Sequence, residues 1–331
     1  MSTTETMRAV IITKPGGPEV LQVQTVARPV PVGDQVRVRV RAAGLNRADL
    51  AQRMGFYPAP AGVPADIPGL EFAGEVDAVG PLVSAWKPGQ RVMGLVSGGA
   101  QADYLLAQEG MLVKIPENLD FVQAAAIPEV FMTAHDALFT QGGLQMGERV
   151  LIHAAGSGVG TAAIQLAHAA GATVYGTSRT PQKLERAKEL GLEVGLSDQH
   201  FADEIKELTR GEGVQMVLDF VGASYMEQNL QALGTWGRLV FLATMGGTNA
   251  QVNLSLVMAK RIQIRGCTLR SRTLEEKLGV TRRFATHVVP LLASSQIVPI
   301  VEEVFPLHEI ARAHQVMGEN RNFGKLIVQL D

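Results

Sequence analysis

Three closely spaced glycines near the middle of the chain could hold a phosphate group. Gly156, Gly158 and Gly160 follow the apolar segment 149–153 and open the helix-like segment 158–170. Glycine lets the backbone turn tightly beside a pyrophosphate, and a helix start offers free N–H groups and a positive dipole end. The strand–turn–helix order predicts a dinucleotide-binding loop, although the spacing departs from G-x-G-x-x-G. We expect Gly156–Gly158 to make the turn and Gly160 to let the helix pack against the strand.

The loop after the next expected strand carries cations and hydroxyl groups. An NAD enzyme places Asp or Glu about 20 residues after the glycine loop, where it binds the ribose 2′-hydroxyl. This chain instead has Ser178, Arg179 and Thr180, with Lys183 one turn into the following helix. These groups suit a 2′-phosphate, so the sequence favours NADP(H) over NAD. The alternative is a solvated loop whose charges serve no ligand.

The segments that carry these loops alternate between strand and helix. Helix-like stretches separate five apolar, strand-like segments, which cover residues 149–153, 173–177, 215–220, 237–243 and 262–267. This alternation predicts an α/β fold with a doubly wound parallel sheet, which we assign to residues 126–269.

The N-terminal part of the chain has a different pattern. Gln35–Arg41 alternates strictly between polar and apolar residues, and Pro- and Gly-rich turns separate it from other short strands. The pattern predicts a β-rich domain over residues 1–125. The last expected strand, 325–329, has no partner in the pattern of the second domain. We therefore expect residues 270–331 to return to the first domain.

The composition excludes several classes of function. The 331 residues include 30 basic and 32 acidic side chains, so the formal net charge is −2, and no basic excess favours nucleic acid or an anionic membrane. The one cysteine rules out a disulfide within the chain and an all-cysteine metal site. No segment has the ~20 apolar residues of a membrane span, and Met1–Met7 lacks the order of a secretory signal. We expect a cytoplasmic protein.

Several motifs, taken in order, resemble the medium-chain dehydrogenase/reductase family and its quinone-oxidoreductase branch. The resemblance covers residues 7–330, and it implies a GroES-like first domain, a Rossmann second domain and an active-site cleft between them. The motifs that carry it are KPGGPEVL at 14–21, LNRADL at 45–50, PGLEFAG at 68–74, KPGQRV at 87–92, AAAIP at 124–128 and NRNFGK at 320–325, together with the glycine loop.

The resemblance also implies the residues that meet the cofactor. Asn46 and Tyr57 would line the nicotinamide and substrate end, and Ser178, Arg179 and Lys183 would meet the 2′-phosphate. The implied cofactor-binding set is Tyr57, Thr133, Gly156, Ser157, Gly158, Val159, Gly160, Ser178, Arg179, Lys183, Leu242, Ala243, Thr244, Met245, Gly246, Thr268, Leu269, Arg270 and Asn322. Two departures leave the exact phosphate ligands open, because segment 195–198 lacks the tyrosine common near the adenine end and loop 178–181 differs from that of the relatives.

The zinc ligands of the family's alcohol dehydrogenases are replaced in this chain. Asn46 stands at the first Cys position and Leu70 at the His position, while Cys267 is remote in sequence. A catalytic zinc needs three protein ligands, so we expect no metal. Without a Lewis acid an alcohol loses its usual route to deprotonation, which favours acceptors that take a hydride readily.

These observations predict zinc-independent, NADPH-dependent reduction of quinones. Asn46 and Tyr57 are the expected catalytic residues, because each can donate a hydrogen bond to a quinone oxygen as negative charge develops. Alternatively, Asn46 caps its loop and Tyr57 is an exposed aromatic among prolines. Two other functions stay open: an NADPH-dependent 2-enoyl or enone reductase, and an NADPH-binding protein with little turnover, as in the family's crystallin.

Two further expectations concern partners and buried polar residues. The family commonly pairs edge strands of two Rossmann domains, so the resemblance implies a homodimer through segment 262–267. The other expected partner is a small quinone or enone. His153 and Asp219 lie near the ends of two expected strands, 149–153 and 215–220, on the side where the glycine turn begins. Bracing of the neighbouring loops is a simpler role for them than catalysis.

Overall fold

The computed structural model describes residues 5–330, which form two compact units. The first unit contains the chain up to Met132 and again from Arg270 onward, and the second spans Thr133–Leu269. Each unit has a hydrophobic core of its own. Phe72 and Phe305 are fully buried in the first core, as is Phe201 in the second.

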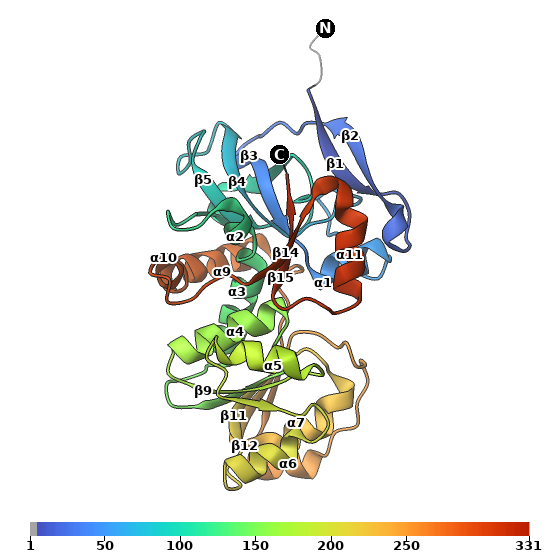
Figure 1. The fold of residues 1–331 in the computed structure, drawn as a ribbon. Helices are drawn as coiled ribbons and strands as arrows, with labels where there is room; N and C mark the ends of the chain where they lie inside the picture. The colour runs from blue at the N-terminus through green and yellow to red at the C-terminus, as the bar shows by residue number, and fades with distance from the viewer. Residues whose placement is uncertain (1–4, 331) are drawn as a thin grey trace. The chain divides into compact units, whose positions relative to one another are not determined.

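A seven-stranded sheet is the centre of the first unit (Figure 1). The strands of this unit are β1 (Thr6–Ile12), β2 (Leu21–Ala27), β3 (Gln35–Gly44), β4 (Glu71–Val79), β5 (Arg91–Leu95), β6 (Tyr104–Gln108), β7 (Leu112–Lys114), β14 (Val301–Pro306) and β15 (Lys325–Gln329). The sheet order is β14-β15-β3-β4-β5-β7, with β6 also paired to β3, while β1 and β2 form a separate antiparallel pair. The final strand β15 thus lies beside β3, antiparallel to it.

The alternation in β3 explains how this sheet is built. Val36, Val38 and Val40 are buried on one face, as the period of two predicts. On the other face Arg37 forms an ion pair with Asp77 at 2.6 Å. The pattern of one strand therefore fixes which face of the sheet meets the core.

Short helices complete the first unit. They are α1 (Arg47–Arg53), α2 (Phe121–Ala125), α9 (Leu274–His287), α10 (Val289–Ala293) and α11 (Ile310–Gly318). The sequence pattern predicts helical structure over 123–140 with Pro128 as a break or a kink. The structure shows a break, with α2 before it and α3 (Pro128–His135) and a π-helical turn over Asp136–Gln141 after it. Pro128 begins α3, because proline cannot continue the preceding helix but fits the first turn of a new one.

The second unit is a six-stranded parallel sheet with helices. Its strands are β8 (Arg149–Ile152), β9 (Thr173–Thr177), β10 (Val194–Leu196), β11 (Val214–Asp219), β12 (Leu233–Phe241) and β13 (Gln263–Gly266). Its helices are α4 (Gly158–Ala169), α5 (Pro181–Lys188), α6 (Phe201–Leu208), α7 (Met226–Ala232) and α8 (Leu254–Lys260). The strand order β10-β9-β8-β11-β12-β13 confirms the doubly wound parallel sheet.

The strand order of the second unit also locates a binding crevice. The chain passes outward from β8 to β9 and β10, then returns to the other side of β8 as β11. In open α/β sheets, ligands bind beyond the carboxyl ends of the strands where the order reverses, here between β8 and β11.

Within residues 5–330, no helix is long and apolar enough to cross a membrane.

Candidate functional site

The turn after β8 has the geometry of an anion-binding loop. Ala154 has a φ of +48°, so this alanine, and not one of the glycines, adopts the left-handed conformation of the turn. Ser157 then caps α4, accepting a hydrogen bond from the Gly160 amide at 3.0 Å. A Cβ on Gly160 would lie 2.4 Å from the Ala154 carbonyl oxygen, so only glycine lets the helix start so close to the turn.

The first amides of α4 are left available. Among the described residues, the backbone N–H groups of Gly158 and Val159 have no hydrogen-bond acceptor. Such amides at a helix start, together with the helix dipole, form a site for a phosphate group.

A buried polar chain braces the strands around this turn. His153 is fully buried, with Nδ1 2.8 Å from Thr177 Oγ1 and Nε2 2.7 Å from Asn229 Oδ1. The Asn229 amide donates in turn to Asp219 at 2.8 Å, and Asp219 accepts from the amides of Val221 and Gly222. These contacts confirm the bracing role predicted for His153 and Asp219.

Burial sets the charge states of His153 and Asp219. It lowers the pKa of His153 to about 4, although the bond to Asn229 acts in the opposite direction. It raises the pKa of Asp219 to about 6, against the three N–H donors that favour the carboxylate. Near neutral pH His153 is therefore neutral and Asp219 is ionised.

The expected 2′-phosphate residues lie in the loop after β9. Ser178 accepts a hydrogen bond from the Thr180 amide at 3.1 Å, and Arg179 is exposed at the loop surface. Lys183 lies in the first turn of α5, half-buried. Burial raises the pKa of the Tyr225 phenol to about 12, and the nearby charge of Arg179 acts in the opposite direction.

The segment 242–246 follows β12 at the same edge of the sheet. The Leu242 amide donates to the Asp219 carbonyl at 2.8 Å, and the Gly246 amide donates to the Val221 carbonyl at 2.6 Å. The backbone of this segment is thus tied to the turn after β11. Ala243 is half-buried, and Thr244 and Met245 are exposed.

Thr133 supplies an unpartnered polar atom in the second unit. Its hydroxyl oxygen is buried and lacks a hydrogen-bond partner among the described residues. A buried hydroxyl without a partner is costly unless a ligand or water satisfies it. Of the other expected cofactor residues in this unit, Thr268 is exposed and Leu269 is buried.

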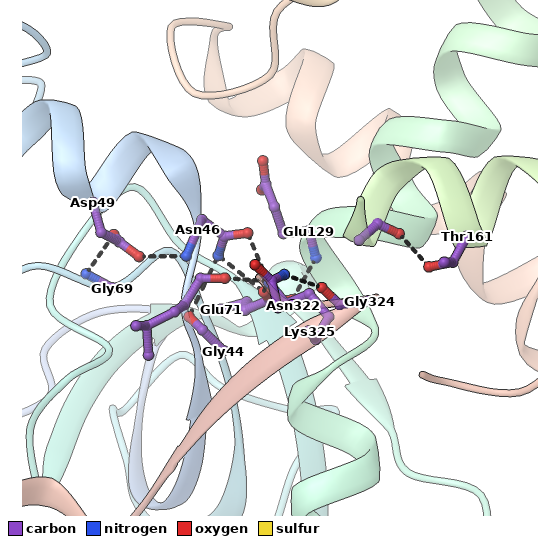
Figure 2. Close-up of polar contacts among 12 residues, drawn as sticks. Gly44, Asn46, Asp49, Gly69, Glu71, Glu129, Thr161, Asn322, Gly324 and Lys325 are labelled. Carbon is purple, nitrogen blue, oxygen red and sulfur yellow. Dashed lines mark hydrogen bonds and ion pairs between the residues drawn. The ribbon is translucent and has the colours of Figure 1, made fainter. Parts of the chain in front are cut away.

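The first unit contains a buried ionic cluster around Asn46 (Figure 2). The Lys325 ammonium contacts Glu71 Oε1 at 2.5 Å and donates to Asn46 Oδ1 at 2.7 Å. Asn46 Nδ2 donates to Glu71 Oε1 at 2.9 Å and more weakly to the Gly44 carbonyl at 3.4 Å. Because Lys325 only donates, the amide orientation of Asn46 is fixed. One N–H of the amide has only the long bond to Gly44.

Asp49 holds the start of α1 beside this cluster. It is fully buried and accepts from the amides of Asn46, at 2.8 Å, and Gly69, at 3.1 Å. Burial raises its pKa to about 6, although both amides favour the carboxylate. Asn46 is the N-cap residue of α1 and forms a capping box with Asp49, so the capping that we considered for Asn46 is present and is shared with the Asp49 carboxylate.

Glu129 is the third carboxyl group near Asn46. Its backbone amide donates to Glu71 Oε2 at 2.8 Å, and in Figure 2 its side chain points away from Glu71 and Lys325. Burial and the Glu71 charge raise its pKa to about 7, against the opposing effects of Lys325 and Arg270.

Tyr57 is held in place by Arg270. The guanidinium carbon of Arg270 lies 4.9 Å from the centre of the Tyr57 ring, and Nη1 donates to the Tyr57 carbonyl at 3.1 Å. Arg270 also donates to Gln52 at 2.6 Å and to the Ser97 carbonyl at 2.9 Å. Burial raises the pKa of the half-buried Tyr57, so its hydroxyl keeps its proton.

The structure gathers the predicted residues into two groups. In the second unit, the glycine turn and segments 178–183 and 242–246 follow the carboxyl ends of β8, β9 and β12, strands of the same parallel sheet. In the first unit, Asn46 and Tyr57 lie near Glu129, which is within electrostatic reach of Tyr57 and of Lys325. Asn322 lies just before β15, where its amide donates to the Gly324 carbonyl at 2.7 Å.

Sequence reasoning missed Glu71, Glu129 and Lys325. A signal was present, because Lys325 is the single charge of an otherwise apolar strand and Glu71 begins a strand whose next three residues are apolar or glycine. Buried charges in such places require a partner of opposite sign.

The described residues contain no group of three His, Cys, Asp or Glu side chains arranged to hold a metal ion. The Lys325 ammonium instead supplies the positive charge beside Asn46 and Glu71.

Family models match both units. The model described as alcohol dehydrogenase GroES-like domain matches residues 33–117, and the one described as zinc-binding dehydrogenase matches residues 158–285. A human quinone oxidoreductase is 34% identical over 337 residues, covering 98% of each chain.

Solved structures resemble the whole chain. The CurK enoyl reductase matches with a TM-score of 0.88 and 29% identity, covering 98% of this chain and 99% of its own. A mycobacterial protein in complex with NADPH matches with the same TM-score and identity, covering 98% of this chain and 100% of its own.

Proposed function

The chain belongs to the medium-chain dehydrogenase/reductase family and is homologous to its quinone oxidoreductases, and on this premise we propose that it reduces quinones with NADPH, without zinc. The observation that carries the proposal is that one chain has both an anion-binding turn, in the second unit, and a polar cluster around Asn46, in the first, and that its described residues include no group of three potential metal ligands.

The second unit fits a nicotinamide dinucleotide. The amides of Gly158 and Val159 suit the pyrophosphate, and the buried Thr133 hydroxyl needs a partner that a ligand can supply. Ser178, Arg179 and Lys183 offer hydroxyl and cationic groups for a 2′-phosphate. When bound in reduced form, this cofactor supplies a hydride.

Replacing Arg179 with alanine is expected to weaken NADPH binding selectively. An exposed charge-assisted contact to phosphate contributes about 1.5 kcal/mol, so the Kd for NADPH rises roughly tenfold. The Kd for NADH, which lacks that phosphate, stays unchanged. Titration of nucleotide fluorescence measures both constants. Lys188→Ala, in the helix that follows the same loop, is the matched control and leaves both values as they were. Equal affinities of the wild type for NADPH and NADH would contradict the proposed preference.

The first unit suits an acceptor that needs no metal. Asn46 retains an N–H group that is only weakly engaged, and Tyr57 keeps its phenolic proton. Both can donate hydrogen bonds to an oxygen on which negative charge develops. Lys325 fixes the Asn46 amide in the orientation that such donation requires.

The likeness to the CurK enoyl reductase favours a second candidate function, the reduction of conjugated C=C bonds in 2-enoyl or enone compounds. The two functions share the same cofactor turn and differ in the acceptor. Consumption of NADPH with a panel of small quinones and 2-alkenals separates them. The proposal expects kcat/KM for the best quinone to exceed that for the best alkenal. The reverse order supports the enone reductase, and binding without turnover supports a protein that only holds NADPH.

We also propose that two copies of the chain associate through β13. This strand is the last in the parallel sheet, and its four residues are exposed, so its outer edge has free backbone groups to pair with a second copy. Size-exclusion chromatography with light scattering tests this, with a dimer expected and a monomer at micromolar concentration contradicting it.

A further inference from the structure

Resting on the proposed function, we propose that Glu129 is the proton donor of the reaction: its carboxylic acid delivers the proton that the acceptor needs besides the hydride. The side chain belongs to the first turn of α3, and its backbone is tied through Glu71 to the cluster that orients Asn46. A proton donor must lie within reach of the reacting oxygen or carbon, and Asn46 and Tyr57 are the groups expected to hold that atom.

Elimination among the carboxyl groups of the cluster leads to Glu129. Glu71 is fully buried and uses both oxygens, one for Lys325 and Asn46 and the other for the Glu129 amide. Asp49 is fully buried and uses both oxygens for backbone amides. Glu129 is partly accessible, and the described residues give its carboxyl oxygens no hydrogen-bond partner. Of these three carboxyl groups, that of Glu129 is therefore the one left to donate to a bound acceptor.

The charges around Glu129 suit a group that gives up and regains a proton. Burial raises the pKa of Glu129, and so do the charges of Glu71 on β4 and Asp49 in the first turn of α1. The charges of Lys325 on β15 and of Arg270 lower it. The balance, about 7, leaves a large protonated fraction at neutral pH. After donation, the carboxylate is stabilised by Lys325 and Arg270. Tyr57 also faces Glu129, and burial raises the pKa of its phenol, which makes it the weaker acid.

The step balances in atoms and electrons. A quinone gains two electrons and one hydrogen as the hydride, which leaves a negative charge on oxygen. An O–H bond forms there while the O–H bond of Glu129 breaks, and the resulting carboxylate regains its proton from water. The sum is NADPH, H⁺ and quinone giving NADP⁺ and hydroquinone. With an enone, the proton goes to the carbon next to the carbonyl group.

The test compares Glu129→Gln with the wild type across pH. Glutamine keeps the size of the side chain but carries no acidic proton, so kcat at pH 6 is expected to fall about 10²-fold. Wild-type kcat/KM falls as pH rises through about 7, the pKa of Glu129 in the free protein, whereas the variant shows no such fall. NADPH affinity is unchanged, Glu129→Asp keeps an intermediate kcat, and Glu117→Gln, an exposed carboxyl of the same unit, leaves kcat unchanged.

A second readout needs no turnover. Infrared difference spectra of the cofactor-free protein between pH 5.5 and 8.5 are expected to contain a protonated-carboxyl band that is lost with a midpoint near 7. Glu129→Gln lacks this band and keeps those of Asp49 and Asp219, whose pKa values are about 6. The absence of quinone and enone turnover in the wild type would overturn the proposed function. Wild-type turnover together with an unchanged kcat and pH profile in Glu129→Gln would overturn the assignment of Glu129 alone. The same holds if Glu129→Gln retains the infrared band whose midpoint lies near 7.

Discussion

Replacing Lys325 with methionine is expected to destabilise the first unit by about 3–5 kcal/mol. Glu71 then becomes a carboxylate buried without a compensating cation, and breaking one partner out of a buried ion pair costs about this much. Asn46 also loses the donor that fixes its amide. Thermal unfolding is expected to shift down by roughly 10 °C.

Tryptophan fluorescence assigns this effect to one unit. The chain has two tryptophans, Trp86 in the first unit and Trp236 in the second. In a Trp236→Phe background, Trp86 reports the first unit, and its transition is the one expected to move with Lys325→Met. The double variant Glu71→Gln with Lys325→Met removes both charges and is expected to regain more than half of the loss. A double variant as unstable as Lys325→Met would contradict the ion-pair explanation.

Replacing Gly160 with alanine is expected to raise the Kd for NADPH roughly 10- to 100-fold. The added Cβ would lie 2.4 Å from the Ala154 carbonyl oxygen and 2.8 Å from that of Ala155. Overpacking against backbone atoms costs about 1–3 kcal/mol, and relief requires α4 to move away from the turn. The amides of Gly158 and Val159 move with it, so the phosphate site opens.

The matched control is Gly279→Ala in α9 of the first unit. The nearest atom to its added Cβ is 3.5 Å away, on the flexible side chain of Arg283, so NADPH affinity stays unchanged. The Kd is measured by nucleotide fluorescence or calorimetry. If Gly160→Ala binds NADPH as tightly as the wild type, the turn after β8 is not the pyrophosphate site.

The α/β fold could be predicted because its pattern is local. Apolar strands alternate with helices over 149–267, and the strand order confirms the parallel sheet. The sequence predicts fewer of the strands whose formation depends on pairing with distant parts of the chain. The short strands β6 and β10 have no strong pattern of their own and exist because β3 and β9 offer them an edge.

The candidate site divides in the same way. The glycine turn is readable from sequence because its residues are contiguous, although the left-handed position proved to be Ala154. The cluster around Asn46 joins Glu71 and Lys325 across 254 positions of sequence, and only the pairing of β15 and β4 with β3 brings them together. No local sequence pattern predicts which strands pair in this way. The contacts of Arg270 with Tyr57, Gln52 and Ser97 are likewise long-range in sequence, so no local pattern could predict them.

The central claim is tested most directly by anaerobic turnover of a small quinone with NADPH. The protein used has a measured zinc content below one-tenth of an equivalent. The account predicts one hydroquinone formed for each NADPH consumed, at a rate that chelator leaves unchanged and that deuterium at the transferred C4 position of NADPH slows. NADPH oxidation no faster than in the enzyme-free mixture, or activity that returns only with stoichiometric zinc, would contradict it.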